Sequence, residues 1–458
     1  MKKQQSIVPI VSVTVLFFMW GFITSLNDIL IPYFKNVYNL SHFQANIVQF
    51  AFFTAYFVCS FIYYFFASKG KDPITKWGYK NTLVIGLIIE TMACGLFALT
   101  AKSHLDFYMF LFCLFMMGIG LTFLQIAANP VVSIIGPSNT ASSRLNLTQA
   151  FNSLGTTLGP ALGGYFIFTY FAKNATGTDA VFKPYLFLAM LLLLLTIFIY
   201  KTKINVNEKV KDLSDKSESL FNKYYVILGA IGIFFYVGAE VCIGSNLVSF
   251  MKETVGMKQE LASAFLSYYW GGAMIGRFLG AVSLSDANKT KKVISMTLLA
   301  IGAFLVIYFV NLSLHGLQLH HVWFFLIFIV LNFIFFYLGQ GKAAQSLAIF
   351  ALVNIGLLFS GIICHGMIAV WSLLAIGLFN SIMWSNVFTL AIDNLGKQTA
   401  KASSILIMMI VGGAILPPLQ GLLADKIGIR LSYFIPMVSY IYLCFYGLKG
   451  YNIGKQIK

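Results

Sequence analysis

The chain has 458 residues, of which 59% are hydrophobic and 10% are charged, and its mean hydropathy is +0.82. Soluble globular proteins carry about a quarter charged residues, so the composition excludes that class and indicates an integral membrane protein. The net charge of +16 does not indicate a nucleic-acid-binding protein, because the lysines are scattered over short loops instead of forming one basic domain.

Apolar runs of about 20 residues, the length that crosses a bilayer as a helix, recur along the whole chain. The chain begins with Met-Lys-Lys and enters such a run without a small-residue cleavage site, so we expect a first span and not a signal peptide. In the first half we expect spans at 7–34, 43–67, 80–101, 106–135, 144–170 and 184–201.

A segment rich in lysine and acidic residues, 202–222, separates the two halves and is predicted to be a cytoplasmic linker. The sequence predicts an all-α polytopic membrane protein with fourteen spans, made of an N-terminal six-helix bundle (1–201) and a C-terminal bundle (223–458). In the second half the spans are expected at 223–251, 260–284, 292–311, 322–340, 343–364, 366–392, 401–424 and 430–448.

The basic residues are distributed unevenly over the loops. If the N-terminus is cytoplasmic, most lysines fall in cytoplasmic segments such as 69–80 and 201–223, and few fall on the other side. The positive-inside rule then predicts that both termini are cytoplasmic. We expect an integral protein of a bacterial inner membrane.

The sequence lacks the motifs of common membrane-bound enzymes and pumps. It contains no H-E-x-x-H, no Gly-x-Ser-x-Gly and no Walker lysine, which argues against zinc peptidases, serine hydrolases and ATP-driven transporters. A sensor or scaffold would need an appended signalling domain, and both termini are short. The six cysteines lie singly in predicted spans without metal-ligand spacing, so we expect neither a metal nor a cofactor.

Residues 118–160 hold two predicted helices with polar side chains at helical spacing. A polar atom that faces lipid tails costs several kcal/mol, so two such stripes should face each other or water. They form either interhelical hydrogen bonds that hold a bundle together or the wall of a hydrophilic cavity, and their length and pairing favour the cavity. The stripes comprise Thr122, Gln125 and Asn129 on the first helix, and Asn146, Gln149 and Asn152 or Ser153 on the second.

The two halves of the chain resemble each other. GIGLTFLQIAANP matches AIGLFNSIMWSNV, which aligns Gly120 with Gly377 and Asn129 with Asn386. Internal repeats on either side of a polar linker are typical of transporters, whose substrate site lies between the repeats near the bilayer midplane.

Three carboxylates, Asp28, Glu90 and Glu240, lie well inside predicted spans. An ionisable group inside a membrane is costly, so each is a candidate functional residue. Asp28 follows Trp20, Thr24 and Asn27 on one helix face. Glu240 lies between two glycines. Glu90 has no polar stripe beside it, so we expect a structural role there. Asp28 and Glu240 are the candidates for binding a coupling cation.

Aromatic rings can stack on the C–H faces of an uncharged, hydroxyl-rich ligand, although most aromatic side chains in a membrane protein pack or lie at the interface. Gln49 and Tyr56 are favoured because they share one helix face at i and i+7. Neutral amides suit an uncharged, hydroxyl-rich ligand, whereas a phosphorylated one would need basic residues that the spans lack. The aromatic candidates are Trp20, Phe52, Tyr56, Tyr268, Tyr269 and Trp384.

Several motifs of this chain resemble the fucose–glucose/galactose:cation symporter family of the major facilitator superfamily. They are WGFITSLNDILIPY, LQIAANP followed by GPSNTASSRLNLTQAFNSLGTT, FNSIM, and VGGAILPPLQGLLAD. The resemblance implies a fold of two six-helix repeats. Because the family has twelve spans, residues 287–341 are interpreted as an inserted helical hairpin.

The resemblance also implies roles for individual residues. Asp28 matches the aspartate of the family's first helix, which implies cation coupling. Gln125 stands where the fucose branch has a second acid and the glucose/galactose branch has glutamine, so the chain resembles the latter. Trp384 and Ser385 replace an expected Phe-Pro pair. The candidate sugar-binding set is Gln49, Tyr56, Gln125, Asn129, Gln149, Asn152, Asn246, Asn380 and Trp384.

The sequence predicts a secondary active transporter that imports a neutral hexose of the glucose/galactose type by proton or sodium symport through alternating access. Alternatives are a symporter for fucose, N-acetylglucosamine, another amino sugar or a polyol, or a membrane sensor that transports nothing. The expected partners are the sugar, the cation and the bilayer, without nucleic acid, and a monomer is expected.

Overall fold

The computed structural model describes residues 7–69, 73–134, 141–174, 176–202, 223–283, 288–339, 342–393, 395 and 399–455. Throughout these ranges the regular structure is helical, which confirms the all-α prediction. The first half contains α1 (Ile7–Val37), α2 (His42–Ser68), α3 (Pro73–Lys102), α4 (Phe107–Ile134), α5 (Ala141–Tyr165) and α6 (Asp179–Lys201), with a π-helical turn, η2 (Phe166–Tyr170), after α5.

The second half begins with two long helices and then a series of mostly shorter ones. In chain order it contains α7 (Tyr224–Val255), α8 (Gln259–Ser283), α9 (Lys289–His315), α10 (Leu319–Val322), α11 (Phe324–Leu338), α12 (Ala343–Ile363), α13 (Gly366–Asn380), α14 (Met383–Ile392), α15 (Thr399–Met408), α16 (Gly412–Ile427), α17 (Ile429–Ser432) and α18 (Phe434–Leu448).

Eleven helical stretches in the described part of the chain are long and apolar enough to cross a membrane. The predicted count of fourteen is therefore not confirmed. The eleven do not include α5 and α8, whose predicted spans carry many polar residues, or α11, which is apolar but has 15 residues. Large exposed side chains such as Leu194 on α6 and Leu298 on α9 are apolar, as the lipid phase requires.

The chain forms two compact units that do not coincide with its two halves. Unit 1 comprises Met1–Thr24, Ala51–Gly155 and Phe166–Lys216, and unit 2 comprises Ser25–Phe50, Thr156–Tyr165 and Ser217–Lys458. Segments of α1, α2 and α5 therefore pack with the helices of the second half. The predicted division into bundles at 1–201 and 223–458 stays a prediction.

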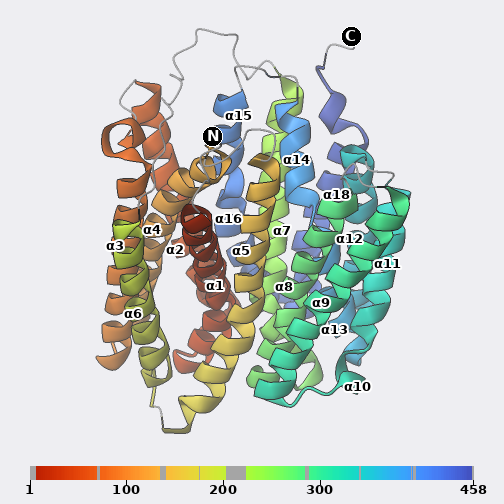
Figure 1. Ribbon diagram of the computed structural model, residues 1–458. Helices are drawn as coiled ribbons and strands as arrows, with labels where there is room; N and C mark the ends of the chain where they lie inside the picture. Colours follow the sequence, from red (N-terminus) through yellow and green to blue (C-terminus); the bar gives the residue numbers. More distant parts are fainter. Residues whose placement is uncertain are drawn as a thin grey trace. The chain divides into compact units, whose positions relative to one another are not determined.

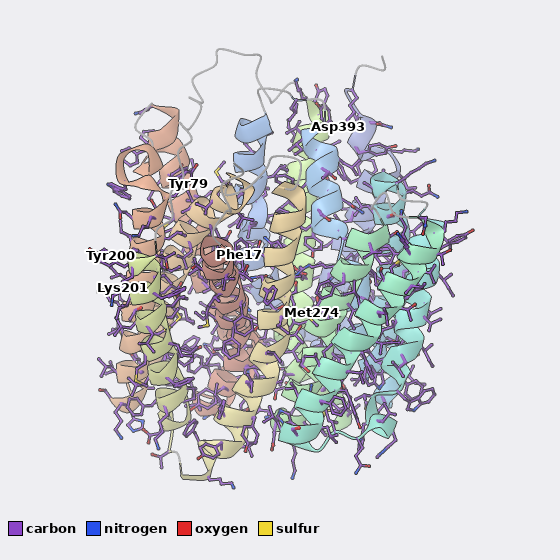
Figure 2. The ribbon with its side chains drawn as sticks, in the orientation of Figure 1. Phe17, Tyr79, Tyr200, Lys201, Met274 and Asp393 are labelled. Carbon is purple, nitrogen blue, oxygen red and sulfur yellow. The ribbon has the colours of Figure 1, made fainter. Side chains whose placement is uncertain are left out.

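In unit 1, α3 lies beside α4 and α6 (Figure 1). Glycines permit close approach: a Cβ at Gly86 of α3 would lie 2.9 Å from the backbone oxygen of Gly120 on α4. At the end of α6, Tyr200 and Lys201 are both exposed (Figure 2), and Lys80 of α3 lies 5.5 Å from the centre of the Tyr200 ring. Aromatic and basic side chains at helix ends are typical of a membrane interface.

In unit 2, α7 packs against α16, α18, α14 and α8, and α8 lies beside α9 and α13 (Figure 1). The pair α9 and α11, within the segment interpreted as an inserted hairpin, packs on α8, α12 and α13. The predicted span 366–392 is interrupted at Ser381 and Ile382 between α13 and α14. This break falls inside the FNSIM motif and leaves Asn380 at the end of α13.

Candidate functional site

Asp28 lies in unit 2, in a cage of uncharged hydrogen-bond donors. Its Oδ1 accepts hydrogen bonds from Gln49 Nε2 (3.0 Å) and Ser245 Oγ (3.1 Å), and its Oδ2 accepts one from Trp270 Nε1 (2.9 Å). Only 2% of Asp28 is exposed, and none of the ion pairs found among the described residues involves it. A buried carboxylate is costly unless hydrogen bonds satisfy it, and these three donors fill most of its acceptor positions.

A glycine makes room for this cage. A Cβ at Gly244 of α7 would lie 3.3 Å from Asp28 Oδ2 and 2.9 Å from Trp270 Cζ2, so any larger residue would push the indole and the carboxylate apart. Gly244 immediately precedes Ser245, which donates to Asp28. The donors come from α2, α7 and α8, and therefore only the folded chain brings them to Asp28.

A second polar chain in unit 2 runs through three buried amides. Asn46 Nδ2 donates to Asn246 Oδ1 (3.0 Å), Asn246 Nδ2 donates to Gln420 Oε1 (3.0 Å), and Gln420 Nε2 donates to Ser432 Oγ (3.3 Å). All four side chains are buried. Asn246, predicted to bind substrate, therefore has protein partners on both of its amide atoms in this conformation.

Glu240 has a basic partner that the sequence did not suggest. Tyr236 donates a hydrogen bond to Glu240 Oε1 (2.8 Å), and Arg277 Nη2 lies 3.7 Å from the same oxygen. The Glu240 side chain is 13% exposed and that of Arg277 is 28% exposed. Arg277 can balance the charge of Glu240, which a mostly buried acid requires. This arrangement is typical of a fixed ion pair. The predicted coupling role of Glu240 stays a prediction.

Asn380 connects several buried tyrosines. Its Nδ2 donates to the Tyr269 hydroxyl (3.0 Å), while its Oδ1 accepts from the Tyr440 hydroxyl (2.6 Å) and from Asn354 Nδ2 (3.1 Å). The Tyr269 hydroxyl in turn donates to the backbone oxygen of Glu240 (2.9 Å). The network joins α8, α12, α13 and α18 to α7, so Asn380 fixes the end of α13 where the helix breaks.

In unit 1 the structure brings together two of the predicted sugar-binding residues. The side chain of Tyr56 on α2 lies close to those of Gln125 on α4 and of Trp20 and Thr24 on α1. Trp20, Thr24 and Gln125 are partly exposed, whereas Tyr56 is 5% exposed. We call these four residues the Tyr56 group. It combines two aromatic rings with hydroxyl and amide groups, as sugar recognition requires.

Other polar residues of the predicted stripes bind the protein backbone. Asn152 Nδ2 donates to the backbone oxygen of Phe17 (3.0 Å), whose ring is labelled in Figure 2. Thr122 is buried and its hydroxyl donates to the oxygen of Gly118 (2.7 Å). In this conformation both residues therefore make the contacts expected of interhelical or intrahelical packing, while Gln149 is half-buried.

Two further candidates are Trp384 and Asn129. Trp384 is partly buried and stacks on Phe388, with the ring centres 5.0 Å apart and the planes 16° apart. Asn129 lies on α4, and its side chain is outside the described part of the structure. Of the others, Gln49 lies in the Asp28 cage, Asn246 in the chain of buried amides, Asn380 in its own network, and Tyr56 and Gln125 in the Tyr56 group.

Sequence reasoning missed Ser245, Trp270 and Arg277. Each comes from a helix remote in sequence from its acid, so no local spacing identifies it. The one available signal was glycine: Gly244 precedes Ser245, and two glycines follow Trp270. Small residues beside a polar or aromatic residue in a membrane helix indicate close packing.

Polar side chains join the ends of α1, α7 and α16 to the start of α2 in unit 2. Glu253 of α7 forms ion pairs with Lys35 of α1 (2.7 Å) and with His42 of α2 (3.1 Å). Asp425 of α16 accepts hydrogen bonds from the backbone amides of His42 (2.7 Å) and Phe43 (2.9 Å), which caps the first turn of α2.

The sequence profile of the Major Facilitator Superfamily matches residues 13–347. The chain belongs to this superfamily. A glucose/galactose transporter of Brucella abortus is 42% identical over 446 residues, covering 96% of this chain and 93% of the relative. The L-fucose-proton symporter of Escherichia coli is 26% identical over 452 residues, covering 93% of this chain and 89% of the relative.

Solved structures agree with this assignment. The crystal structure of a single-residue variant of the Escherichia coli fucose:proton symporter superposes with a TM-score of 0.61 at 23% identity, covering 99% of this chain and 100% of that one. At that identity the likeness establishes the fold of this superfamily member. Together with the relatives, it confirms the predicted resemblance to the fucose–glucose/galactose symporters and to their glucose/galactose branch.

Proposed function

We propose that this superfamily member is a secondary active transporter that imports a neutral hexose of the glucose/galactose type together with a cation, by alternating access. The observation that carries the proposal is the Asp28 cage: a buried acid held by uncharged donors, with no ion pair found for it in the described residues. Such an acid can exchange a cation, because no fixed positive charge competes for it.

The substrate class is supported by the Tyr56 group and by the relatives. Gln125 and Thr24 can pair with sugar hydroxyls, while the partly exposed ring of Trp20 offers an apolar face for the sugar's C–H groups. The similar proteins are named as a glucose/galactose transporter and an L-fucose-proton symporter. Fucose and N-acetylglucosamine are the alternative sugars, and a sensor that transports nothing is the alternative function.

The Asp28 cage is compatible with a proton or with sodium. Oδ2 accepts one hydrogen bond and keeps a lone pair that can take a proton. Sodium would need several oxygen ligands, and Gln49 Oε1, which is buried without a hydrogen-bond partner, could add to those of Asp28 and Ser245. Sodium would therefore use the amide oxygen of Gln49 as a ligand, whereas a proton would not.

Accumulation of labelled hexoses in proteoliposomes tests the function. With an imposed proton or sodium gradient, the inside concentration of glucose or galactose should exceed the outside one, and collapse of the correct gradient should abolish the excess. Fucose and N-acetylglucosamine measured in parallel identify the sugar. The absence of any gradient-driven accumulation for the whole panel would contradict the proposal and favour the sensor.

We also propose that the chain crosses the bacterial inner membrane fourteen times as a monomer, with both termini cytoplasmic and α9 and α11 as an inserted pair near 287–341. Ser313 in the last turn of α9 is exposed and tests this topology. In a variant without native cysteines, Ser313→Cys should react with an impermeant maleimide on intact cells. Labelling that appears only after lysis would contradict the fourteen-span arrangement.

A further inference from the structure

Glu90, in the middle of α3, is the least satisfied acid in the described part of the chain. It is 0% exposed, and neither of its carboxyl oxygens has a hydrogen-bond partner. The backbone amide of Leu121 on α4 lies near the carboxyl but makes no hydrogen bond of normal geometry with it. The ion pairs of the described residues do not include Glu90.

The site of Glu90 is built around two glycines. A Cβ at Gly120 of α4 would lie 2.8 Å from Glu90 Cγ and 2.9 Å from the backbone oxygen of Gly86 on α3. The absence of a side chain at Gly120 therefore gives the Glu90 stem its space. It also leaves α3 and α4 in close backbone contact, with the Leu124 side chain of α4 packed against Gly86.

The ionisable side chains around Glu90 are tyrosines and cysteines, which carry no positive charge. Tyr56 of α2, Tyr185 of α6 and Cys94 one turn along α3 interact with it, and Cys113 of α4 interacts with Cys94. No lysine, arginine or histidine acts on Glu90 among the described residues. A carboxylate in such a place would cost several kcal/mol, so Glu90 holds its proton in this conformation.

A purely structural role explains this arrangement poorly. An acid that serves as interhelical glue makes a hydrogen bond, and an apolar residue would fill the same space without the cost of an unpaired carboxyl. Glu90 also acts on Tyr56, the residue that joins α1 and α4 in the Tyr56 group. A charge on Glu90 would therefore act electrostatically on the group that is the best candidate for sugar contact in unit 1.

We propose that Glu90 is a second proton-binding group of the transport cycle. It is protonated in the conformation described here and releases its proton when α3 and α4 slide at Gly86 and Gly120 and admit water. Each cycle binds one proton to the carboxylate from the side of sugar entry and releases one from the carboxylic acid on the other side. The transmembrane proton gradient supplies the proton, and the inference rests on the proposed sugar symport.

The test is the number of protons carried per sugar by the full-length protein in proteoliposomes. Glu90→Gln keeps the shape of the protonated acid but cannot release a proton. We expect it to carry one proton fewer per sugar than the wild type, to lose the corresponding part of the pH dependence, and to keep equilibrium exchange of labelled sugar. Asp106→Asn, which removes an exposed carboxylate of unit 1, is the matched control and should retain the wild-type ratio.

An unchanged proton-to-sugar ratio and pH profile in Glu90→Gln would overturn the inference, because the residue would then be permanently neutral. If the variant does not fold, infrared difference spectra of the wild type decide: sugar binding or a change of pH should alter a protonated-carboxyl band that Asp28→Asn retains. The absence of such a band would also overturn it. A wild type that transports no sugar would instead refute the proposed function.

Discussion

Asp28 and Glu90 are buried to nearly the same degree, yet their surroundings are opposite. Asp28 accepts three hydrogen bonds from neutral donors on three helices, whereas Glu90 has none and faces only neutral groups. Donors of this kind stabilise a carboxylate, and their absence favours the protonated acid. Burial and chemical group are thus alike, so the hydrogen-bond partners make the difference between the two sites.

The surroundings of a third acid, Glu240, differ from both. It has a tyrosine donor and an arginine at 3.7 Å, so its charge is balanced inside unit 2. An acid with a fixed cation has less reason to exchange a mobile one. We therefore expect Asp28 to be the strongest candidate for cation binding and Glu90 the next, whereas Glu240 already has an ionic partner in Arg277. The variants below test this ranking.

The largest effect is expected for Asp28→Asn. An asparagine mimics the neutral acid, so gradient-driven accumulation should be lost, whereas exchange of sugar down its own gradient should continue because exchange requires no deprotonation. The new amide NH₂ must face a donor of the cage, which should lower the free energy of unfolding by about 1–3 kcal/mol. Sugar accumulation and equilibrium exchange, measured on the same proteoliposomes, check the prediction.

Two results would change the interpretation of Asp28. Retained accumulation would remove it from the coupling mechanism and leave Glu90 and Glu240 to be tested. Loss of both accumulation and exchange in a folded protein would show direct sugar binding or a structural role.

The next largest effect concerns the free energy of unfolding. Arg277→Gln leaves Glu240 without its cation, and because both side chains are partly exposed we expect a loss of about 1–3 kcal/mol. The Glu240→Gln/Arg277→Gln double variant should recover part of that loss, and it should still accumulate sugar. Thermal unfolding of the four proteins gives the coupling energy. A Glu240→Gln variant that folds normally but fails to accumulate sugar would return Glu240 to the coupling mechanism.

Gln125 and Asn152 separate sugar contact from helix packing. Gln125 belongs to the partly exposed Tyr56 group, so Gln125→Ala should weaken sugar binding about 5- to 150-fold, as expected for a lost hydrogen bond of about 1–3 kcal/mol. The Asn152 amide donates to the backbone of α1, so Asn152→Ala should cost about 1 kcal/mol of stability and leave affinity nearly unchanged. Calorimetric sugar titration and thermal unfolding of both variants measure the difference.

Much of the fold follows from local sequence. Each apolar run became a helix because no other structure satisfies its backbone polar groups in lipid. The break between α13 and α14 was not predicted, since no glycine or proline marks Ser381 and Ile382. The Asn380 network, drawn from four other helices, fixes the end of α13. The packing of 25–50 with the second half was not predicted either, because it depends on contacts between distant segments.

The candidate site was only partly predictable for the same reason. An acidic residue within an apolar run is visible in the sequence, so Asp28, Glu90 and Glu240 could all be found there. Helical spacing shows which amides share a face but not what they face: Gln125 meets Tyr56, while Asn152 meets the backbone of Phe17. The role expected for Glu90 was structural because its sequence neighbours are apolar, and the missing partner became visible only in the folded chain.

The smallest effect is expected for Glu253, a partly exposed acid of α7 that pairs with Lys35. Its side chain is 36% exposed and pairs with Lys35 and His42, so the charges are screened by water and salt. Glu253→Gln should therefore change the free energy of unfolding by at most about 1 kcal/mol, less at high salt, and keep the wild-type number of protons per sugar. Thermal unfolding at two salt concentrations and the proton-to-sugar ratio test this. A lost proton in this variant would show that exposure to solvent does not exclude an acid from coupling, and the contrast between Asp28 and Glu90 would then no longer be enough to rank the acids of this protein.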